Sequence, residues 1–347
     1  MNRPGQTGRS ARRPRGRLVP LGVLVAAVAA AIGLVVWEVQ TAPSALDGQV
    51  AGPTTWSSGA AGDGVATGAF GRWRGSPVGI AATWNDSLEA QTNQWTLQPG
   101  AEYGSWDADL DLSVGAIYKD QGESWSAAVD GAYDERWATA LRAVERARSG
   151  REGTIYLRFA HEFNGEWEPW SVTSAEVDDF RAAWSRFRDL QQEILPQAQL
   201  VFCPTSETSS SLGLRWTDAT PDADDVDVMA VDYYNQYPFV DDKASFDDLL
   251  DEVDPEGAPR GLDAHRVYAG ERGEPFAISE WNSNADMGDS AAFMVLMRRW
   301  LEQHAGSGAG EVLYEIQFNV SNYGSGQFMT HPVGRQPDAS AAYRTLW

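Results

Sequence analysis

The chain has 347 residues, with 27 basic and 49 acidic side chains, so its formal net charge at pH 7 is −22. Nucleic acid is a poor partner for such a chain, because its phosphates need a basic surface. The single cysteine, Cys203, excludes an internal disulfide, so the fold must depend on its core. The length suits one large domain with an extension.

The N-terminus predicts export across a membrane. Residues 1–17 carry six arginines, and an uncharged, mostly apolar run of 20 residues follows from Leu18 to Trp37. Such a run can span a bilayer core of about 30 Å, and the positive charge before it keeps the N-terminus in the cytoplasm. A cleaved signal peptide is the alternative, although its apolar region would be about 7–15 residues. We expect a basic cytoplasmic segment at 1–17 and a transmembrane anchor at 18–37. Everything that follows is then extracytoplasmic, either anchored to the cell membrane or secreted after cleavage.

Residues 38–66 lack hydrophobic periodicity and are rich in Gly, Ser and Pro, which predicts a flexible linker. Eight later segments are strand candidates. They are 78–84, 101–106, 110–118, 153–161, 199–205, 226–234, 275–281 and 312–320. Helical periodicity separates several of them, so the pattern predicts a (β/α)8 TIM barrel over 67–347. The second and third candidates are too close for an intervening helix, so either this crossover is degenerate or one boundary is wrong.

The fourth candidate strand runs into the most informative motif of the chain, residues 158–170, which reads RFAHEFNGEWEPW. It places Glu162 beside His161, Asn164 and two tryptophans just after the strand. Active sites of parallel barrels are built at the C-terminal ends of strands. A second carboxylate, Glu280, ends the seventh candidate strand. Glycosidic hydrolysis needs such a pair of carboxyl groups, one to protonate the leaving oxygen and one to attack or stabilise the anomeric carbon.

At these residues the chain resembles the family 26 glycoside hydrolases, which are mostly endo-β-1,4-mannanases with a (β/α)8 barrel and a retaining mechanism. The strand-four signature of that family matches Arg158, His161, Glu162, Asn164, Gly165 and Trp167. The resemblance implies that Glu162 is the acid/base and that Glu280, in the strand-seven match at 275–281, is the nucleophile. In the strand-six match at 227–234 it implies that Tyr234 supports the nucleophile. Together these roles predict carboxyl groups about 5–5.5 Å apart.

The remaining candidates are expected to bind substrate or to support the pair. Arg158 could hold Glu280 ionised by opposite charge, and His161 and Asn164 could hydrogen-bond a carboxylate or a sugar hydroxyl. Flat rings stack on the C–H face of a pyranose. The aromatic candidates for this role are Trp84, Trp167, Trp170, Trp281 and Phe318. For each tryptophan the alternative is a place in the core, and the polar candidates could be buried groups with structural partners.

The resemblance covers most of 67–347 but is tight only at strands four, six and seven. Where family mannanases usually carry a tryptophan on strand eight, this chain has Phe318, and the usual histidine of strand three is missing. β-1,4-Mannan is therefore the first expectation for the substrate, and a β-glucan or a bacterial exopolysaccharide is the alternative. A third reading is a non-catalytic envelope protein that binds polysaccharide.

No cofactor or metal site is indicated by the sequence. The run His-Glu-Phe-Asn-Gly at 161–165 lacks the second histidine of a zinc motif, and the acidic residues at 222–227 lack the glycine and terminal glutamate of a calcium loop. A structural calcium ion is left open. We expect a monomer whose partners are a β-linked polysaccharide and, through its N-terminal segment, the membrane.

Overall fold

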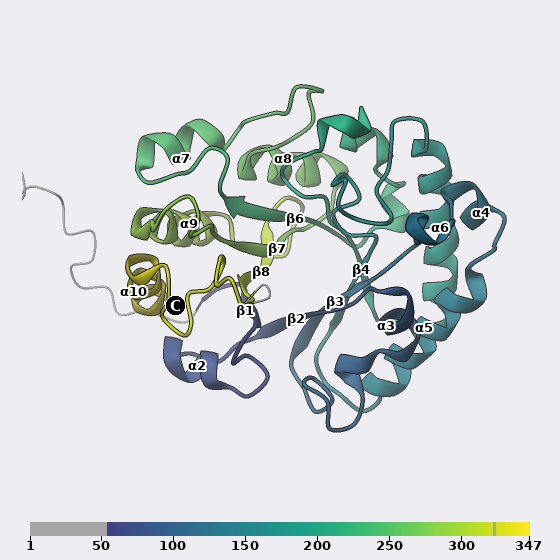
Figure 1. The fold of residues 1–347 in the computed structure, drawn as a ribbon, viewed down its shortest axis with the longest axis horizontal. Coiled ribbons are helices and arrows are strands. Elements are labelled where there is room, and N and C mark those ends of the chain that lie inside the picture. Colours follow the sequence, from purple (N-terminus) through teal and green to yellow (C-terminus); the bar gives the residue numbers. More distant parts are fainter. Residues whose placement is uncertain (1–53, 322–323) are drawn as a thin grey trace, which may run out of the picture. The chain divides into compact units, whose positions relative to one another are not determined.

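The computed structural model describes residues 54–321 and 324–347. Eight parallel strands follow one another around a closed barrel, and the last strand pairs with the first (Figure 1). The strands are β1 (Ser57–Gly62), β2 (Ile80–Asn85), β3 (Asp109–Val114), β4 (Ile155–Phe159), β5 (Gln199–Phe202), β6 (Val228–Asn235), β7 (Phe276–Ser283) and β8 (Val312–Asn319). The predicted (β/α)8 barrel is therefore confirmed.

α-Helices lie outside the barrel in the connections between most successive strands, and short 3-10 helices take their place between β5 and β6 (Figure 1). The α-helices are α2 (Ala69–Arg74), α3 (Leu88–Asn93), α4 (Trp125–Val129), α5 (Asp134–Arg148), α6 (Val177–Ile194), α7 (Lys243–Leu249), α8 (Leu262–Arg272), α9 (Ala291–His304) and α10 (Pro337–Leu346). The apolar face of α6 shows how they pack, since Phe187 stacks on Phe159 of β4 with ring centroids 4.0 Å apart. Outward-facing strand residues thus form the main core, and inward-facing ones form a smaller core inside the barrel.

The first strand of the barrel lies inside the segment that was predicted to be a flexible linker, so the boundary at 66 is wrong. Strand β1 consists of Ser, Gly and Ala, which carry no strand signal in the sequence. Small residues are required here because a Cβ atom at Gly59 would collide with the backbone oxygen of Ile80 on the neighbouring strand. Packing against β2 and β8 therefore makes this segment a strand despite its weak intrinsic preference.

The second predicted strand, 101–106, is a region of turns, which explains why it left no room for a crossover helix before the third. The true second strand is β2, and the short helix α3 lies between β2 and β3. Its aromatic residues misled the prediction: Tyr103 is buried and packs edge-on against Trp106.

Glu315 of β8 joins the two ends of the barrel. It is fully buried and accepts hydrogen bonds from Ser58 Oγ at 2.6 Å and from Trp347 Nε1 at 3.0 Å. Trp56 Nε1, just before β1, donates to the same carboxylate at 3.4 Å. Residues on either side of the predicted linker boundary are therefore parts of one closed structure.

No helix within 54–321 and 324–347 is long and apolar enough to cross a bilayer. The predicted cytoplasmic segment at 1–17 and the predicted anchor at 18–37 both lie outside the described residues.

Removing β1 should prevent folding. A chain that begins at residue 67 lacks β1 and leaves the edges of β2 and β8 unpaired. A chain that begins at residue 54 keeps β1 and its pairing with both neighbours. We expect a cooperative thermal transition by circular dichroism only for the longer chain. A cooperative transition of the shorter chain at a similar temperature would contradict the role of β1.

Candidate active site

A cleft of about 690 Å³ lies at the C-terminal ends of the strands, and both predicted catalytic glutamates line it. Its lining residues come from six strands and the loops that follow them. They are Trp84, Asp86, His161, Glu162, Trp167, Glu168, Thr205, Glu207, Tyr234, Gln236, Glu280, Phe318, Val320, Ser321 and Phe328. Seven of the eleven predicted site residues are among them.

Three donors fix the carboxylate of Glu280. Its Oε1 accepts hydrogen bonds from Arg158 Nη1 at 2.9 Å and from Trp84 Nε1 at 3.0 Å. Its Oε2 accepts one from the hydroxyl of Tyr234 at 2.7 Å. The side chain is almost fully buried, so its orientation is set by these partners rather than by solvent. The predicted proximity of Arg158 and Tyr234 to Glu280 is confirmed.

Arg158 lies beneath the cleft and is fully buried. Besides Glu280, its guanidinium donates to Asp111 Oδ1 at 2.6 Å through Nε and to Asp232 Oδ2 at 3.2 Å through Nη1. Asp111 also accepts hydrogen bonds from Ser279 Oγ at 2.9 Å and from the Tyr314 hydroxyl at 3.0 Å. One cation is thus surrounded by carboxyl groups from β3, β6 and β7, and the guanidinium cannot turn without breaking several charged contacts.

A bulge in β7 brings Glu280 to the inside of the barrel. The register of β7 shifts against both β6 and β8 at this point. As a result Ser279 and Glu280 both contact inner residues, and the next side chain, Trp281, turns outward. Trp281 is fully buried and donates to Glu315 Oε2 at 2.5 Å, next to the ring of Trp347. The prediction that Trp281 binds sugar is therefore wrong, since its ring lies between the barrel and α10.

Glu162 is held on a tight turn directly after β4. Its backbone is left-handed, with φ of 51°, and that of Ala160 is also left-handed, with φ of 52°. For a residue with a Cβ this conformation costs about 1–3 kcal/mol and is kept only when neighbouring contacts determine it. Here the Glu162 N–H donates to the Cys203 oxygen at 2.8 Å, and the Gly165 N–H donates to the Glu162 oxygen at 2.7 Å. The turn points the carboxyl group into the cleft.

The setting of Glu162 favours its protonated form. Burial, followed by repulsion from Glu280, raises the pKa of Glu162 to about 7. The hydrogen bond from Trp167 Nε1 to Glu162 Oε2, at 2.7 Å, acts in the opposite direction. Trp167 itself is 55% exposed, as expected for a ring that is available to a ligand. The two glutamates therefore share one cleft but sit in different environments.

His161 is a neutral residue of the same cleft. Burial, followed by the positive charge of Arg158, holds the pKa of His161 well below its usual range. Its Nε2 lies 4.0 Å from Asp86 Oδ2, which is too long for a hydrogen bond. His161 is therefore placed to offer a neutral imidazole to a ligand.

Aromatic rings from three strands and one loop form one wall of the cleft. Phe318 lies edge-on to both Trp84 and Tyr234, with centroids 5.4 and 5.6 Å away. Phe328, which the sequence did not suggest, packs against Tyr234 at 4.6 Å. Trp84 and Phe318 are thus confirmed as cleft residues. Tyr233, the residue before Tyr234 on β6, points to the outer core, because neighbouring residues of a strand face opposite sides.

Two further predicted site residues support the loops and do not line the cleft. Asn164 is fully buried and clamps the segment after β5, donating to the Thr205 oxygen at 2.8 Å and accepting from the Thr205 N–H at 2.9 Å. Trp170 is also buried and donates to the backbone oxygen of His161 at 2.7 Å. Both positions hold the turn that carries Glu162, so neither side chain is placed to contact a ligand in the cleft.

Several residues of the site were missed by the sequence analysis. Asp232 lies within the strand-six match and Asp111 lies two residues into β3, where alternation on a strand could have marked them as inward-facing. Asp86 and Glu168 come one or two positions after the predicted residues Trp84 and Trp167, and this closeness in sequence could have marked them as site residues. Within the described residues no group of three or more His, Cys, Asp or Glu side chains is arranged to hold a metal ion.

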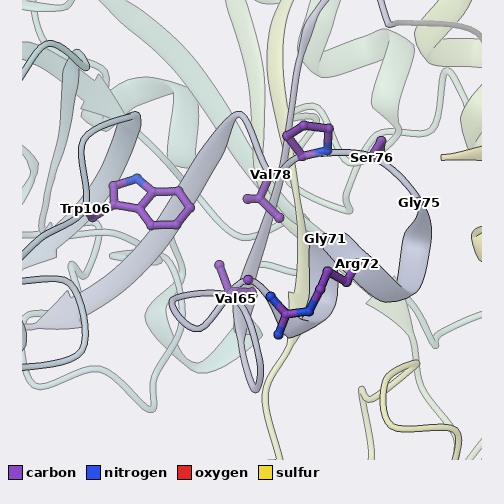
Figure 2. Close-up of a pocket in the computed structure, with 9 residues that line it drawn as sticks. Val65, Gly71, Arg72, Gly75, Ser76, Val78 and Trp106 are labelled. Carbon is purple, nitrogen blue, oxygen red and sulfur yellow. The ribbon is translucent and has the colours of Figure 1, made fainter.

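A second hollow, of about 500 Å³, lies beside α2, between Arg72 and Val78 on one side and Trp106 on the other (Figure 2). Three glycines and Val65 complete much of its lining. It contains no carboxylate, so the chemistry expected from the sequence belongs to the cleft that holds Glu162 and Glu280.

Comparison of the sequence with family models and with curated proteins finds no match. Solved structures do match. The catalytic domain of the family 26 endo-β-1,4-mannanase of Bacillus sp. JAMB-750 aligns with a TM-score of 0.58 at 14% identity, over 83% of this chain and 84% of that one. GH26C from Muricauda sp. aligns with a TM-score of 0.52 at 13% identity, over 76% and 79%. The family 26 β-mannanase of Bacteroides ovatus aligns with a TM-score of 0.50 at 14% identity, over 78% and 80%. The chain therefore has the fold of the family 26 glycoside hydrolases, as its motifs suggested.

The electrostatic link between the two glutamates can be measured. Because the negative charge of Glu280 raises the pKa of Glu162, Glu280→Gln should lower that pKa below its wild-type value of about 7. Trp167→Phe should raise it, because the lost hydrogen bond favours the ionised carboxylate. Carboxyl 13C NMR titration of both variants gives the two shifts. An unchanged titration in Glu280→Gln would show that the groups do not interact.

Proposed function

We propose that the protein is a retaining β-glycosidase in which Glu280 is the nucleophile and Glu162 the acid/base. The observation that carries this proposal is the contrast between two glutamates that line one cleft. Glu280 receives three hydrogen bonds, one from a buried guanidinium, whereas burial and repulsion raise the pKa of Glu162 to about 7. A nucleophile must be charged and a general acid must carry a proton, and these environments suit those roles. The fold shared with family 26 enzymes supports the same assignment.

The reaction follows from these positions. Glu162 gives its proton to the glycosidic oxygen as that bond breaks, and Glu280 attacks the anomeric carbon to form a glycosyl ester. Water then attacks the same carbon, Glu162 takes one of its protons, and the carboxylate of Glu280 leaves. Retention requires the two carboxyl groups to be about 5–5.5 Å apart, because no water stands between Glu280 and the sugar in the first step. Arg158, Trp84 and Tyr234 keep Glu280 aimed at that carbon.

The proposed substrate is a β-linked hexose polymer, cut within the chain, with β-1,4-mannan as the first candidate. The mannanases with this fold support that candidate. The aromatic wall differs from the family pattern, since Phe318 replaces the usual tryptophan and Phe328 packs beside it. A β-glucan or a bacterial exopolysaccharide is the alternative. A non-catalytic binding protein would not need an acid and a nucleophile in distinct settings.

We further propose that the barrel acts outside the cytoplasm, attached to the membrane through residues 18–37 or released by cleavage. This part rests on the arginine-rich segment and the apolar run of the sequence alone.

The hydrolytic assignment is tested with the full chain on galactomannan, glucomannan, mixed-linkage glucan and xylan. Glu162→Gln and Glu280→Gln should each lower the release of reducing ends from the preferred polymer by about 10²-fold or more. Glu166→Gln is the matched control, because Glu166 lies in the same loop as Glu162 but is exposed and does not line the cleft. Equal rates in the wild type and both cleft variants would overturn the mechanism. NMR of the first product should show the β-anomer.

The pH profile should report the proton on Glu162. Since the pKa of Glu162 is raised to about 7, the acid is present below that pH and is lost above it. We expect kcat/KM to fall about tenfold per pH unit on the alkaline side, with the limb moved to higher pH in Trp167→Phe. A flat profile up to pH 9 would exclude Glu162 as the general acid.

A further inference from the structure

The cleft contains more carboxyl groups than the proposed reaction uses. Besides the catalytic pair, it is lined by the carboxyl groups of Asp86, Glu168 and Glu207, and no lysine or arginine is among its lining residues. Glu207 has a cation nearby, since Arg260 lies 3.6 Å from it. The other two, Asp86 after β2 and Glu168 after β4, have no ion-pair partner among the described lysines and arginines. Glu168 is close enough to Glu162 and Asp86 for the negative charges of both to raise its pKa.

Among the described residues, neither carboxyl group accepts a hydrogen bond from another residue, and Asp86 has only its own backbone N–H. Within 54–321 and 324–347 no side chain or backbone N–H lies within hydrogen-bond distance of the Glu168 carboxyl group. The nearest charged or titratable partner of Asp86 is His161 Nε2, 4.0 Å away. His161 is only 5% exposed, lines the same cleft, and its Nδ1 has no partner in the described part of the chain. A polar group buried as deeply as His161 normally has a partner. The carboxyl groups of Asp86 and Glu168 are partly exposed, so a ligand in the cleft can reach them.

Burial sets the protonation of both acids in the free protein. It raises the pKa of Asp86 to about 6 and, with repulsion from Glu162, Asp86 and Glu280, raises the pKa of Glu168 to about 9. Arg158 is the cation that acts on both, and it opposes these shifts without preventing them. A negative charge here is therefore costly until a positive group arrives.

The chemistry of the cleft limits the ligand group that completes it. A uronic acid would add another negative charge beside the existing five carboxyl groups. The arrangement does not suit a metal ion, since no described group of acids and histidines could hold one. An ammonium group supplies a compact positive charge and three donors, so it suits a cleft lined with carboxyl groups.

We propose, on the basis of the proposed function, that the natural polymer contains unacetylated hexosamine residues, whose ammonium group binds beside Asp86 and Glu168 next to the catalytic pair. The same site admits a neutral hexose less tightly and disfavours an acidic one. Where the amine of the free sugar is already protonated, binding of the ammonium group displaces the proton of Glu168 into solution, so uptake of such a sugar releases a proton. A neutral sugar leaves that proton in place.

The test is calorimetric titration of the full-length Glu162→Gln variant, which binds without cutting. The probes are a β-1,4-linked glucosamine hexamer, the same hexamer fully N-acetylated, and mannohexaose. At pH 5.5, where the amines of the free hexamer are protonated, and at low salt we expect the glucosamine hexamer to bind roughly tenfold or more tightly than either neutral hexamer. High salt should remove most of that difference. Titration in two buffers of different ionisation enthalpy should show proton release for the glucosamine hexamer only.

Two further substitutions locate the effect. Adding Glu168→Gln or Asp86→Asn should remove the preference for the glucosamine hexamer and leave binding of mannohexaose within about twofold. Adding the control Glu166→Gln should leave the preference intact. Equal or weaker binding of the glucosamine hexamer, no binding of it at all, or a preference that survives both cleft substitutions would overturn the inference. If the wild type cleaves mannan but the glucosamine hexamer is not preferred, the glycosidase assignment stands and the hexosamine inference fails. If the glucosamine hexamer is preferred but no polymer is cleaved, only the binding inference stands.

Discussion

The buried guanidinium of Arg158 is the interaction on which the site depends. It lies under the cleft and contacts Asp111, Asp232 and Glu280, which reach it from three other strands. Burying a charge is costly unless partners replace water, and removing one partner from such a group is more costly than never having buried it. The carboxylates and the guanidinium therefore require one another, and the closed barrel is what brings them together.

This arrangement makes Glu280 rigid and leaves Glu162 adjustable. Glu280 is held from below by a charged network and from the side by Trp84 and Tyr234. Glu162 stands on a left-handed turn and is held at the rim by Trp167, which is largely exposed. A nucleophile benefits from a fixed direction of attack, whereas an acid/base must accept two protonation states in one catalytic cycle.

The sequence could predict those parts of the site that lie in one continuous stretch. Arg158, His161, Glu162 and Trp167 follow one another along a strand and its loop, so one match to the family motif placed them together. Contacts between strands depend on register, which a single sequence does not contain. This is why the role of Asp111 was not foreseen.

The errors have local physical causes. Strand β1 was read as a linker because its glycines and alanines carry no strand preference, and only the close approach of β2 and β8 makes it a strand. Trp281 was placed in the cleft together with Glu280, although neighbours on a strand face opposite sides. The bulge in β7 decides which of the two enters the cleft, and a bulge at this position has no signal in the residues around it.

In the proposed mechanism, the exposed ring of Trp167 would link substrate binding to the proton on Glu162. In the free protein its N–H favours the ionised carboxylate, while burial and Glu280 favour the acid. A sugar that packs on this ring would exclude water from Glu162. The effects of burial and of the Glu280 charge on its pKa would then become stronger, because charge repulsion grows as the local dielectric falls. The bound polymer would then keep its own general acid protonated until Glu280 is neutralised by forming the ester. Once that charge is gone, the main repulsion on Glu162 is gone as well, and the same carboxyl group can serve as a base.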